Sequence, residues 1–175
     1  MVNNVSKSPM DEQLYQQLRQ LANTLMVKER SGHTLSPTDL VHNAYLKLSA
    51  YEGEFKDKKH YYRTLAQQMR RLLIDYGRIK STAKKEGSVQ ALNYTDSLGV
   101  SVESIDMQCL IDAVDALADM DQRSYEITQL VYFAAVPINE VGRLMDLSAA
   151  TVERDLKFGR AFINDYISGE AECLS

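Results

Sequence analysis

The sequence contains few cysteines and no long apolar run. Its two cysteines, Cys109 and Cys173, are too few for a disulfide framework, so the composition predicts a reduced, cytoplasmic protein. No stretch approaches the roughly 18 apolar residues that a membrane span needs. The first residues, MVNNVSKSPMDEQ, lack the apolar core of a signal peptide. The sequence therefore predicts no membrane partner.

Common catalytic and metal-binding motifs are also missing. The patterns HExxH, GxxxxGKS/T, GxSxG and CxxC do not occur. The three histidines, His33, His42 and His60, have no ligand spacing with the cysteines. The carboxylates between residues 96 and 126 lie on predicted helix faces and ends, where solvation explains them. We therefore expect no enzymatic activity, no metal site and no cofactor.

Helical periodicity is the main pattern that is present. The 175 residues, 45% hydrophobic and 25% charged, have the composition of a globular protein and the length of one large or two small domains. Apolar residues recur at helical spacing through most of the chain, and no alternating strand pattern occurs. The sequence therefore predicts an all-α fold.

The charged residues are unevenly distributed. Residues 1–53 hold 5 basic and 5 acidic side chains, residues 54–85 hold 10 and 3, and residues 86–175 hold 5 and 16. The middle segment is a basic patch that can meet nucleic acid. The acidic second half would repel DNA phosphates, so we expect the chain alone to bind duplex DNA weakly.

Three helices are predicted in the N-terminal half. The second should begin at Ser36, a serine cap followed by Pro37 and by an acid at Asp39. The third should run from about residue 57 to 79. The apolar stripes of the three helices are Leu14, Leu18, Leu21 and Leu25; Val41, Ala44, Tyr45 and Leu48; and Tyr62, Leu65, Met69, Leu72, Leu73 and Tyr76.

Periodicity fails between residues 81 and 105, where small and polar residues predict a linker. Helical spacing then resumes with Met107, Leu110, Ile111, Val114 and Leu117. The predicted organisation is two small helical domains, residues 10–80 and 106–168, joined by the flexible linker 81–105.

The segment from residue 136 to 163 has the pattern of a helix-turn-helix. Pro137 suits a first helical turn, Asp146-Leu147 makes a break, and Ser148 is placed to cap a second helix. That helix has one apolar stripe of Val152, Leu156, Gly159 and Ile163, and an opposite face of Thr151, Arg154, Lys157 and Arg160. A capped helix with a basic outer face after a tight turn is the geometry that fills a DNA major groove. A plain helical hairpin with a solvated charged face is the alternative.

Aromatic side chains are interleaved with the basic patch. Bases of a single strand stack on such rings while cations follow the backbone. Tyr61 and His60 lie off the apolar stripe and are the stacking candidates, whereas Tyr62 and Tyr76 are expected in the core. In the last helix, Arg154 is the candidate for a bidentate contact with guanine.

These segments together resemble an extracytoplasmic-function (ECF) sigma factor, over about residues 10–167. DLVHNAYLKL resembles the region 2.2 helix, FKDKKHYYRTLAQQMRRLLIDYGRIK resembles regions 2.3 and 2.4, and LSAATVERDLKFGRAFI resembles the region 4.2 recognition helix. The phrase ERSGHTLSPTDLVHNAYLKL is similar to an ECF-like subfamily. The resemblance implies a polymerase subunit that melts the −10 promoter element with its first domain and recognises the −35 element with its second.

The resemblance also implies partners and site residues. The partners are bacterial core RNA polymerase, through its β′ clamp and β flap, and promoter DNA; an anti-sigma factor stays open. The residues expected at the clamp are Asp39, Leu40, Asn43, Leu46 and Lys47. Those expected at −10 DNA are Lys59, His60, Tyr61, Arg63, Arg70, Arg71 and Arg78, and those at −35 DNA are Ser148, Thr151, Glu153, Arg154, Lys157 and Arg160.

The chain departs from the family pattern at four positions. Asn43 stands where many relatives carry an acid, and Arg71 where an asparagine near the flipped −10 base is frequent. Asp146 replaces the usual turn glycine, and Asp tolerates the left-handed conformation better than most residues. Pro137 replaces a hydroxyl cap. We expect −10 specificity to differ and the helix-turn-helix to remain intact.

Two other functions compete with a sigma factor. A stand-alone helix-turn-helix regulator would form stable dimers and bind duplex DNA without polymerase, but it leaves the basic patch of residues 54–85 unexplained. A pure interaction module would bind a protein and no DNA, so substitution of Arg154 and Lys157 would not affect transcription.

Overall fold

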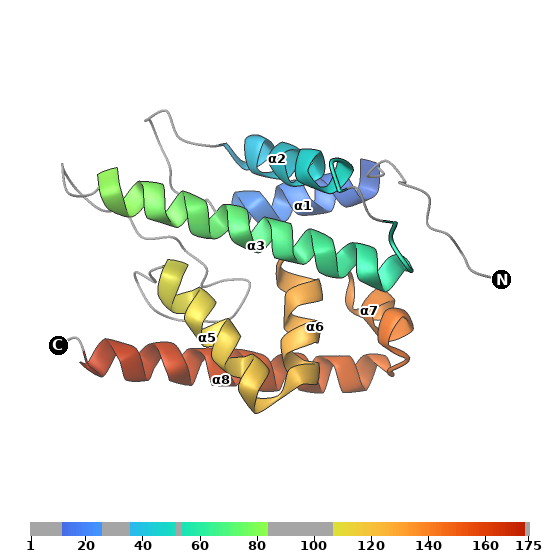
Figure 1. Ribbon diagram of the computed structural model, residues 1–175. Helices are drawn as coiled ribbons and strands as arrows, with labels where there is room; N and C mark the ends of the chain where they lie inside the picture. Colours follow the sequence, from blue (N-terminus) through green and yellow to red (C-terminus); the bar gives the residue numbers. More distant parts are fainter. Residues whose placement is uncertain (1–11, 26–35, 52–53, 84–106, 174–175) are drawn as a thin grey trace.

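The computed structural model describes residues 12–25, 36–51, 54–83 and 107–173 (Figure 1). Every regular element within these ranges is a helix, which confirms the predicted all-α class. The helices are α1 Glu12–Leu25, α2 Pro37–Ser49, α3 Lys58–Ala83, α5 Met107–Met120, α6 Gln122–Tyr132, α7 Ile138–Met145 and α8 Ala149–Cys173. Within the same ranges, no helix combines the length and the apolar character needed to cross a membrane.

The start of α2 is fixed by a capping box, as predicted. The backbone N–H of Asp39 donates to the hydroxyl oxygen of Ser36 over 3.1 Å, and the N–H of Ser36 donates to the Asp39 carboxylate over 2.9 Å. Pro37 occupies the first turn, where its missing N–H costs nothing. Local sequence alone therefore determines where this helix begins.

The central helix α3 extends further than predicted. It begins after Asp57, whose carboxylate accepts the N–H of His60 over 2.7 Å, and it continues to Ala83. Three residues assigned to the predicted linker are therefore helical, and the rest of that segment, 84–105, lies outside the described residues. In Figure 1, α3 lies between α1 and α2 on one side and α5, α6 and α7 on the other.

The N-terminal group, α1 to α3, buries most of the described residues of the predicted apolar stripes, while Tyr45 and Tyr62 are half-buried. Helix α2 packs on both α1 and α3. The core of the three-helix group includes five side chains with almost no exposure: Leu18, Leu40, Leu65, Met69 and Leu73. The side chains of Leu21, Leu25 and Tyr76, also predicted in these stripes, lie outside the described part.

The C-terminal group, α5 to α8, is built around the stripe predicted on α8. Val152, Leu156, Gly159 and Ile163 are all buried, against α5 and α6. A Cβ at Gly159 would lie 2.8 Å from the Thr128 hydroxyl oxygen, so glycine allows α8 to approach α6 closely.

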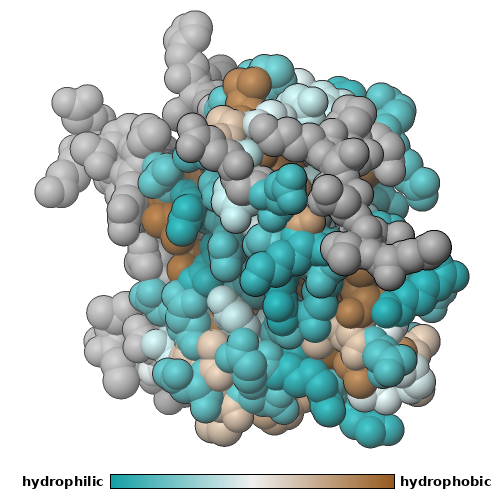
Figure 2. All heavy atoms as spheres, turned by 45° about the vertical axis from the view of Figure 1, so that its right-hand side comes forward, coloured by the Kyte–Doolittle hydropathy of each residue, from teal (hydrophilic) through white to brown (hydrophobic). Residues whose placement is uncertain are grey.

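Over the face shown in Figure 2, hydrophilic side chains predominate and apolar ones form smaller groups.

Candidate nucleic-acid interface

Helices α7 and α8 are joined by a tight turn. Helix α7 begins after Pro137, whose carbonyl accepts the N–H of Val141 over 2.9 Å. It ends at Asp146, which is left-handed with φ 55° and ψ 47°, and the N–H of Leu147 returns to the carbonyl of Gly142 over 2.8 Å. The prediction that Asp146 can replace a turn glycine is confirmed.

Gly142 makes this turn possible by its lack of a side chain. A Cβ at this position would lie 2.8 Å from the backbone carbonyl oxygen of Leu147, which cannot move without shifting the turn. We expect Gly142→Ala to lower the free energy of unfolding by about 1–3 kcal/mol, because overpacking forces a backbone shift. Chemical denaturation would measure this change.

Gly169→Ala is the matched control for that substitution. Gly169 lies on α8 with nothing within 4 Å of its would-be Cβ, so alanine there should be neutral or stabilising by up to about 1 kcal/mol. Equal stabilities of the two variants would contradict the steric role of Gly142.

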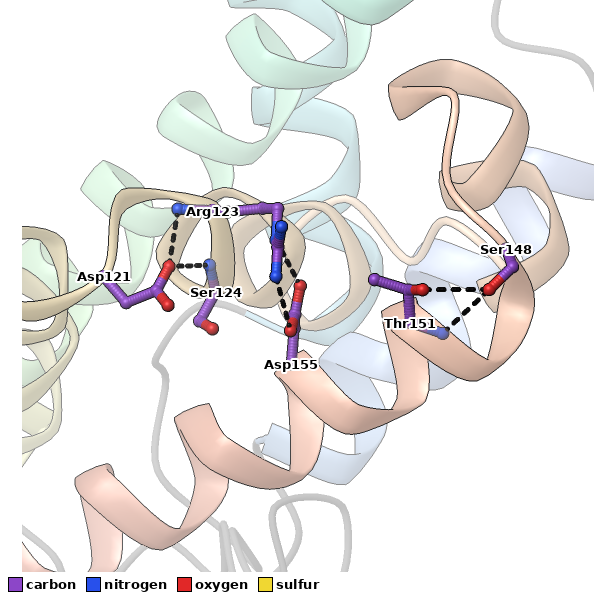
Figure 3. A network of polar contacts seen from close by, with 6 residues as sticks. All are labelled: Asp121, Arg123, Ser124, Ser148, Thr151 and Asp155. Carbon is purple, nitrogen blue, oxygen red and sulfur yellow. Dashed lines mark hydrogen bonds and ion pairs between the residues drawn. The ribbon is translucent and has the colours of Figure 1, made fainter.

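The second helix begins at the predicted cap. The Ser148 hydroxyl oxygen accepts the N–H of Thr151 over 3.2 Å, and the two hydroxyls are hydrogen-bonded over 2.9 Å (Figure 3). Ser148 and Thr151, both predicted at −35 DNA, therefore hydrogen-bond to each other at the N-terminal end of α8. Such helix ends favour phosphate groups, because free N–H groups and the helix dipole point outward.

An ion pair joins α8 to α6. Arg123 on α6 donates to both carboxylate oxygens of Asp155, with Nε to Oδ2 at 2.6 Å and Nη2 to Oδ1 at 3.1 Å (Figure 3). Hydrogen bonding to Asp155 raises the pKa of the Arg123 guanidinium. Asp121 caps α6 beside this pair by accepting the N–H groups of Arg123 and Ser124. Sequence reasoning missed this pair, since its partners lie 32 positions apart on different helices.

The outer face of α8 is open and basic. Glu153, Arg154 and Lys157 are exposed, and Phe158 on the same helix is 44% exposed. Arg160 is exposed as well, but its Nε donates to the Tyr132 hydroxyl and its guanidinium lies over the Tyr132 ring. Burial raises the pKa of Tyr132, and the hydrogen bond from Arg160 opposes that shift. Arg154 and Lys157 are thus available to a ligand, whereas Arg160 is held against α6.

Four of the five residues predicted at the polymerase clamp lie along one side of α2, and Leu40 does not join them at the surface. Leu46 is 50% exposed, Lys47 is exposed and Asn43 is half-buried. Asp39 is exposed, but its carboxylate is engaged by Ser36, and those hydrogen bonds lower its pKa. Leu40 is fully buried, so the expectation that it is presented to a partner is wrong. The reason is that Leu40 continues the apolar stripe of Val41, Ala44 and Leu48 toward α1 and α3.

Of the two stacking candidates on α3, Tyr61 is buried and His60 is half-buried. Tyr61 is only 8% exposed and lies edge-on to Phe55 at 5.2 Å, so the prediction that it lies off the apolar face is wrong. His60 also contacts Phe55, at 5.7 Å, and its Nδ1 accepts the N–H of Lys56. Tyr62, predicted in the core, is half-buried instead. Phe55, which precedes α3, packs against the rings of His60 and Tyr61. Helical spacing alone does not predict these contacts.

The basic face of α3 comprises Lys58, Lys59, Arg63 and Arg70, and its cations pair with acids of the C-terminal group. Lys58 Nζ lies 2.7 Å from Glu140 Oε1, and this hydrogen bond lowers the pKa of Glu140. The remaining pairs join Lys59 to Glu126 at 3.3 Å, Arg63 to Glu126, and Arg70 to Asp115.

Two further arginines predicted at −10 DNA differ from this group. Arg71 is exposed, and none of the ion pairs found among the described residues includes it. Arg78 belongs to α3 by its backbone, while its side chain lies outside the described part. Lys59, Arg63 and Arg70 therefore share one side of α3, where they pair with acids of the C-terminal group, and Arg71 does not take part in these pairs.

A helix-turn-helix with an open basic helix, downstream of a helical group with a basic central helix, is the arrangement expected for the resemblance noted in the sequence. A family model described as ECF sigma factor matches residues 4–169 of the 175. The chain belongs to the ECF sigma factor family. No curated protein and no solved structure matches it.

As an ECF sigma factor, the protein has a role in transcription initiation, with core RNA polymerase and promoter DNA as partners. Within the described ranges, no group of three or more His, Cys, Asp and Glu side chains is placed to hold a metal ion.

Proposed function

We propose that this ECF sigma factor reads the −35 promoter element with α8 and recognises and melts the −10 element with α3. Helix α2 would dock on the β′ clamp of the polymerase, and the C-terminal group would contact the β flap. The observation that carries the proposal is the helix-turn-helix itself, with its capped second helix and outward-facing Arg154 and Lys157.

The geometry of α8 supports specific duplex recognition. Its buried stripe packs the helix on α5 and α6, and the Arg123–Asp155 pair joins α6 to the residue that follows Arg154. An arginine carried on a packed helix can form two hydrogen bonds with the edge of guanine. Lys157, as a point charge, suits a phosphate, which positions the protein without specifying sequence.

The composition of α3 supports contact with opened DNA. Four cations follow one face over about 18 Å of helix, the length from Lys58 to Arg70 at 1.5 Å per residue. Arg71 adds an exposed cation beside them. Backbone-tracking cations are the main requirement of single-strand binding. His60 and Tyr62, both partly exposed, are the rings nearest this face that can meet a base.

The first experiment is reconstituted transcription. The purified chain would be added to sigma-free bacterial core polymerase with a library of upstream DNA fragments, and the transcripts sequenced. We expect starts at a subset of fragments that share two short motifs, with weak binding of the same DNA by the chain alone. Absence of transcripts, with tight duplex binding by the chain alone, would instead indicate a stand-alone regulator.

A further inference from the structure

Tyr132 joins the core of the C-terminal group to a cation on its surface. It is the last residue of α6 and is only 5% exposed. Its hydroxyl oxygen accepts the Nε–H of Arg160, which lies on α8, 28 positions away in the chain. The central guanidinium carbon of Arg160 lies 5.5 Å from the centre of the Tyr132 ring. One buried side chain of α6 therefore holds one exposed side chain of α8 by two contacts.

These contacts leave the outer edge of the Arg160 guanidinium unused. Only Nε takes part in the hydrogen bond. Among the hydrogen bonds and ion pairs found in the described part of the chain, none includes the two terminal Nη nitrogens of this exposed residue. The paired N–H groups of an arginine match two oxygens of a phosphate. Arg160 is therefore held at one edge and open to an anion at the other.

The position of Arg160 around α8 directs it at the wall of a DNA groove. It lies six residues after Arg154, which is about 9 Å along the helix and about 120° around it. A helix with its side chains is about 10–12 Å across and the major groove is about 12 Å wide, so the flanks of an inserted helix face phosphates. When Arg154 points at the base edges, Arg160 thus points at the backbone, and phosphate contacts of this kind position a protein on the duplex.

We propose that Tyr132 is a positioning residue for −35 recognition, whose hydroxyl holds Arg160 in the orientation in which its guanidinium binds a backbone phosphate. The inference rests on the proposed function of α8 and adds to it a residue of α6 that lies beneath the DNA contact. A mobile arginine loses side-chain freedom when it binds a ligand, and one that is already held loses less. The end of α6 contributes as well, because the last carbonyl groups of a helix carry partial negative charge that favours a cation.

A double-mutant cycle tests the positioning role. Tyr132→Phe removes the hydroxyl and keeps the ring, while Arg160→Ala removes the guanidinium. The measured quantity is the affinity of the chain, assembled with core polymerase, for a fluorescent duplex whose −35 element comes from the transcription experiment. We expect Tyr132→Phe to weaken binding about 3- to 10-fold, which corresponds to the net contribution of a typical hydrogen bond. It should have no further effect in the Arg160→Ala background, because no guanidinium remains to be held.

A purely structural role for Tyr132 predicts a different result. Loss of packing or stability would weaken binding by the same factor whether or not Arg160 is present. Equal factors in the two backgrounds would therefore overturn the proposal. Tyr15→Phe makes the same change at a half-buried tyrosine on α1, and this matched control should leave the affinity unchanged.

Neutral linkages in the DNA identify the group that Arg160 contacts. Phosphates of the duplex would be replaced one at a time by uncharged methylphosphonates. We expect one linkage, within or beside the −35 element, at which the replacement weakens binding of the native chain but not of Arg160→Ala. At that linkage Tyr132→Phe should cost nothing further. If the effect of Tyr132→Phe depended on the −35 bases and on no phosphate, Arg160 would contact a base edge and the proposal would be wrong.

The contact between Tyr132 and Arg160 also has a readout that needs no DNA. In nuclear magnetic resonance spectra of the free chain, the Nε–H of Arg160 should exchange with water more slowly than that of the exposed Arg154. Tyr132→Phe should remove this protection, and equal exchange in the two chains would overturn the contact and the proposal with it. Absence of transcription with core polymerase, with the protection retained, would instead contradict the proposed function and leave the contact standing.

Discussion

Replacing Arg154 with alanine should lower transcription from promoters that carry guanine at the contacted −35 position by about 5- to 150-fold. This range corresponds to the about 1–3 kcal/mol that a bidentate base contact contributes. The side chain is exposed on α8, so its loss should not affect folding. The measurement is reconstituted transcription on promoter variants substituted one base at a time.

The pattern across promoters separates specificity from general affinity. Arg154→Ala should equalise promoters that differ at one or two −35 bases. Lys157→Ala should instead weaken binding to all of these promoters alike. It should also reduce the slope of log affinity against log salt concentration by about 1. Arg19→Ala, an exposed arginine on α1, is the control and should change neither quantity. A uniform loss with Arg154→Ala would show that it contacts phosphate rather than a base edge.

Placing an acid at Leu46 should weaken binding to core polymerase by about 10- to 100-fold. Leu46 is a half-exposed leucine on α2, and burying such a side chain in an interface contributes about 1.5–3 kcal/mol. Leu46→Glu would lose that burial and introduce a charge that has to be desolvated. Titration of a fluorescent chain with sigma-free core would give the change in affinity.

Met120→Glu is the matched control for this substitution. Met120 is 64% exposed at the end of α5, so the same change from an apolar side chain to an acid falls away from α2. Both variants should retain the native thermal stability, because exposed substitutions rarely change it by more than about 0.5 kcal/mol. Unchanged affinity of Leu46→Glu for core would remove α2 from the polymerase interface.

Features that depend on neighbouring residues in the chain could be predicted from the sequence. The capping box at Ser36, the cap at Ser148 and the left-handed turn at Asp146 each form between residues within a few positions of one another. The stripe Val152, Leu156, Gly159 and Ile163 is buried as its spacing predicts. In each case the local segment itself supplies the hydrogen-bond partner, the turn conformation or the apolar face that the structure uses.

The candidate site was less predictable because burial there depends on distant partners. The family resemblance predicts Leu40 at a partner surface, and helical spacing predicts Tyr61 off the apolar stripe. Both are buried, since a helix packed on two sides has more than one apolar face. The charge asymmetry between residues 54–85 and 86–175 is visible in the sequence, where it predicts a nucleic-acid contact for the first segment and repulsion of DNA by the second. Opposite net charges on two segments also predict that they attract each other.

The sequence by itself determined the helices, the capped starts of α2 and α8, the helix-turn-helix and the family, because these depend on short-range spacing and residue type. Only the tertiary structure decided which charges are available. It placed Glu126 against Lys59 and Arg63, joined Arg123 to Asp155, and left Arg154 and Lys157 open to solvent. Such pairings depend on how separate helices pack, and no local pattern encodes the distance between residues that lie 32 or 82 positions apart.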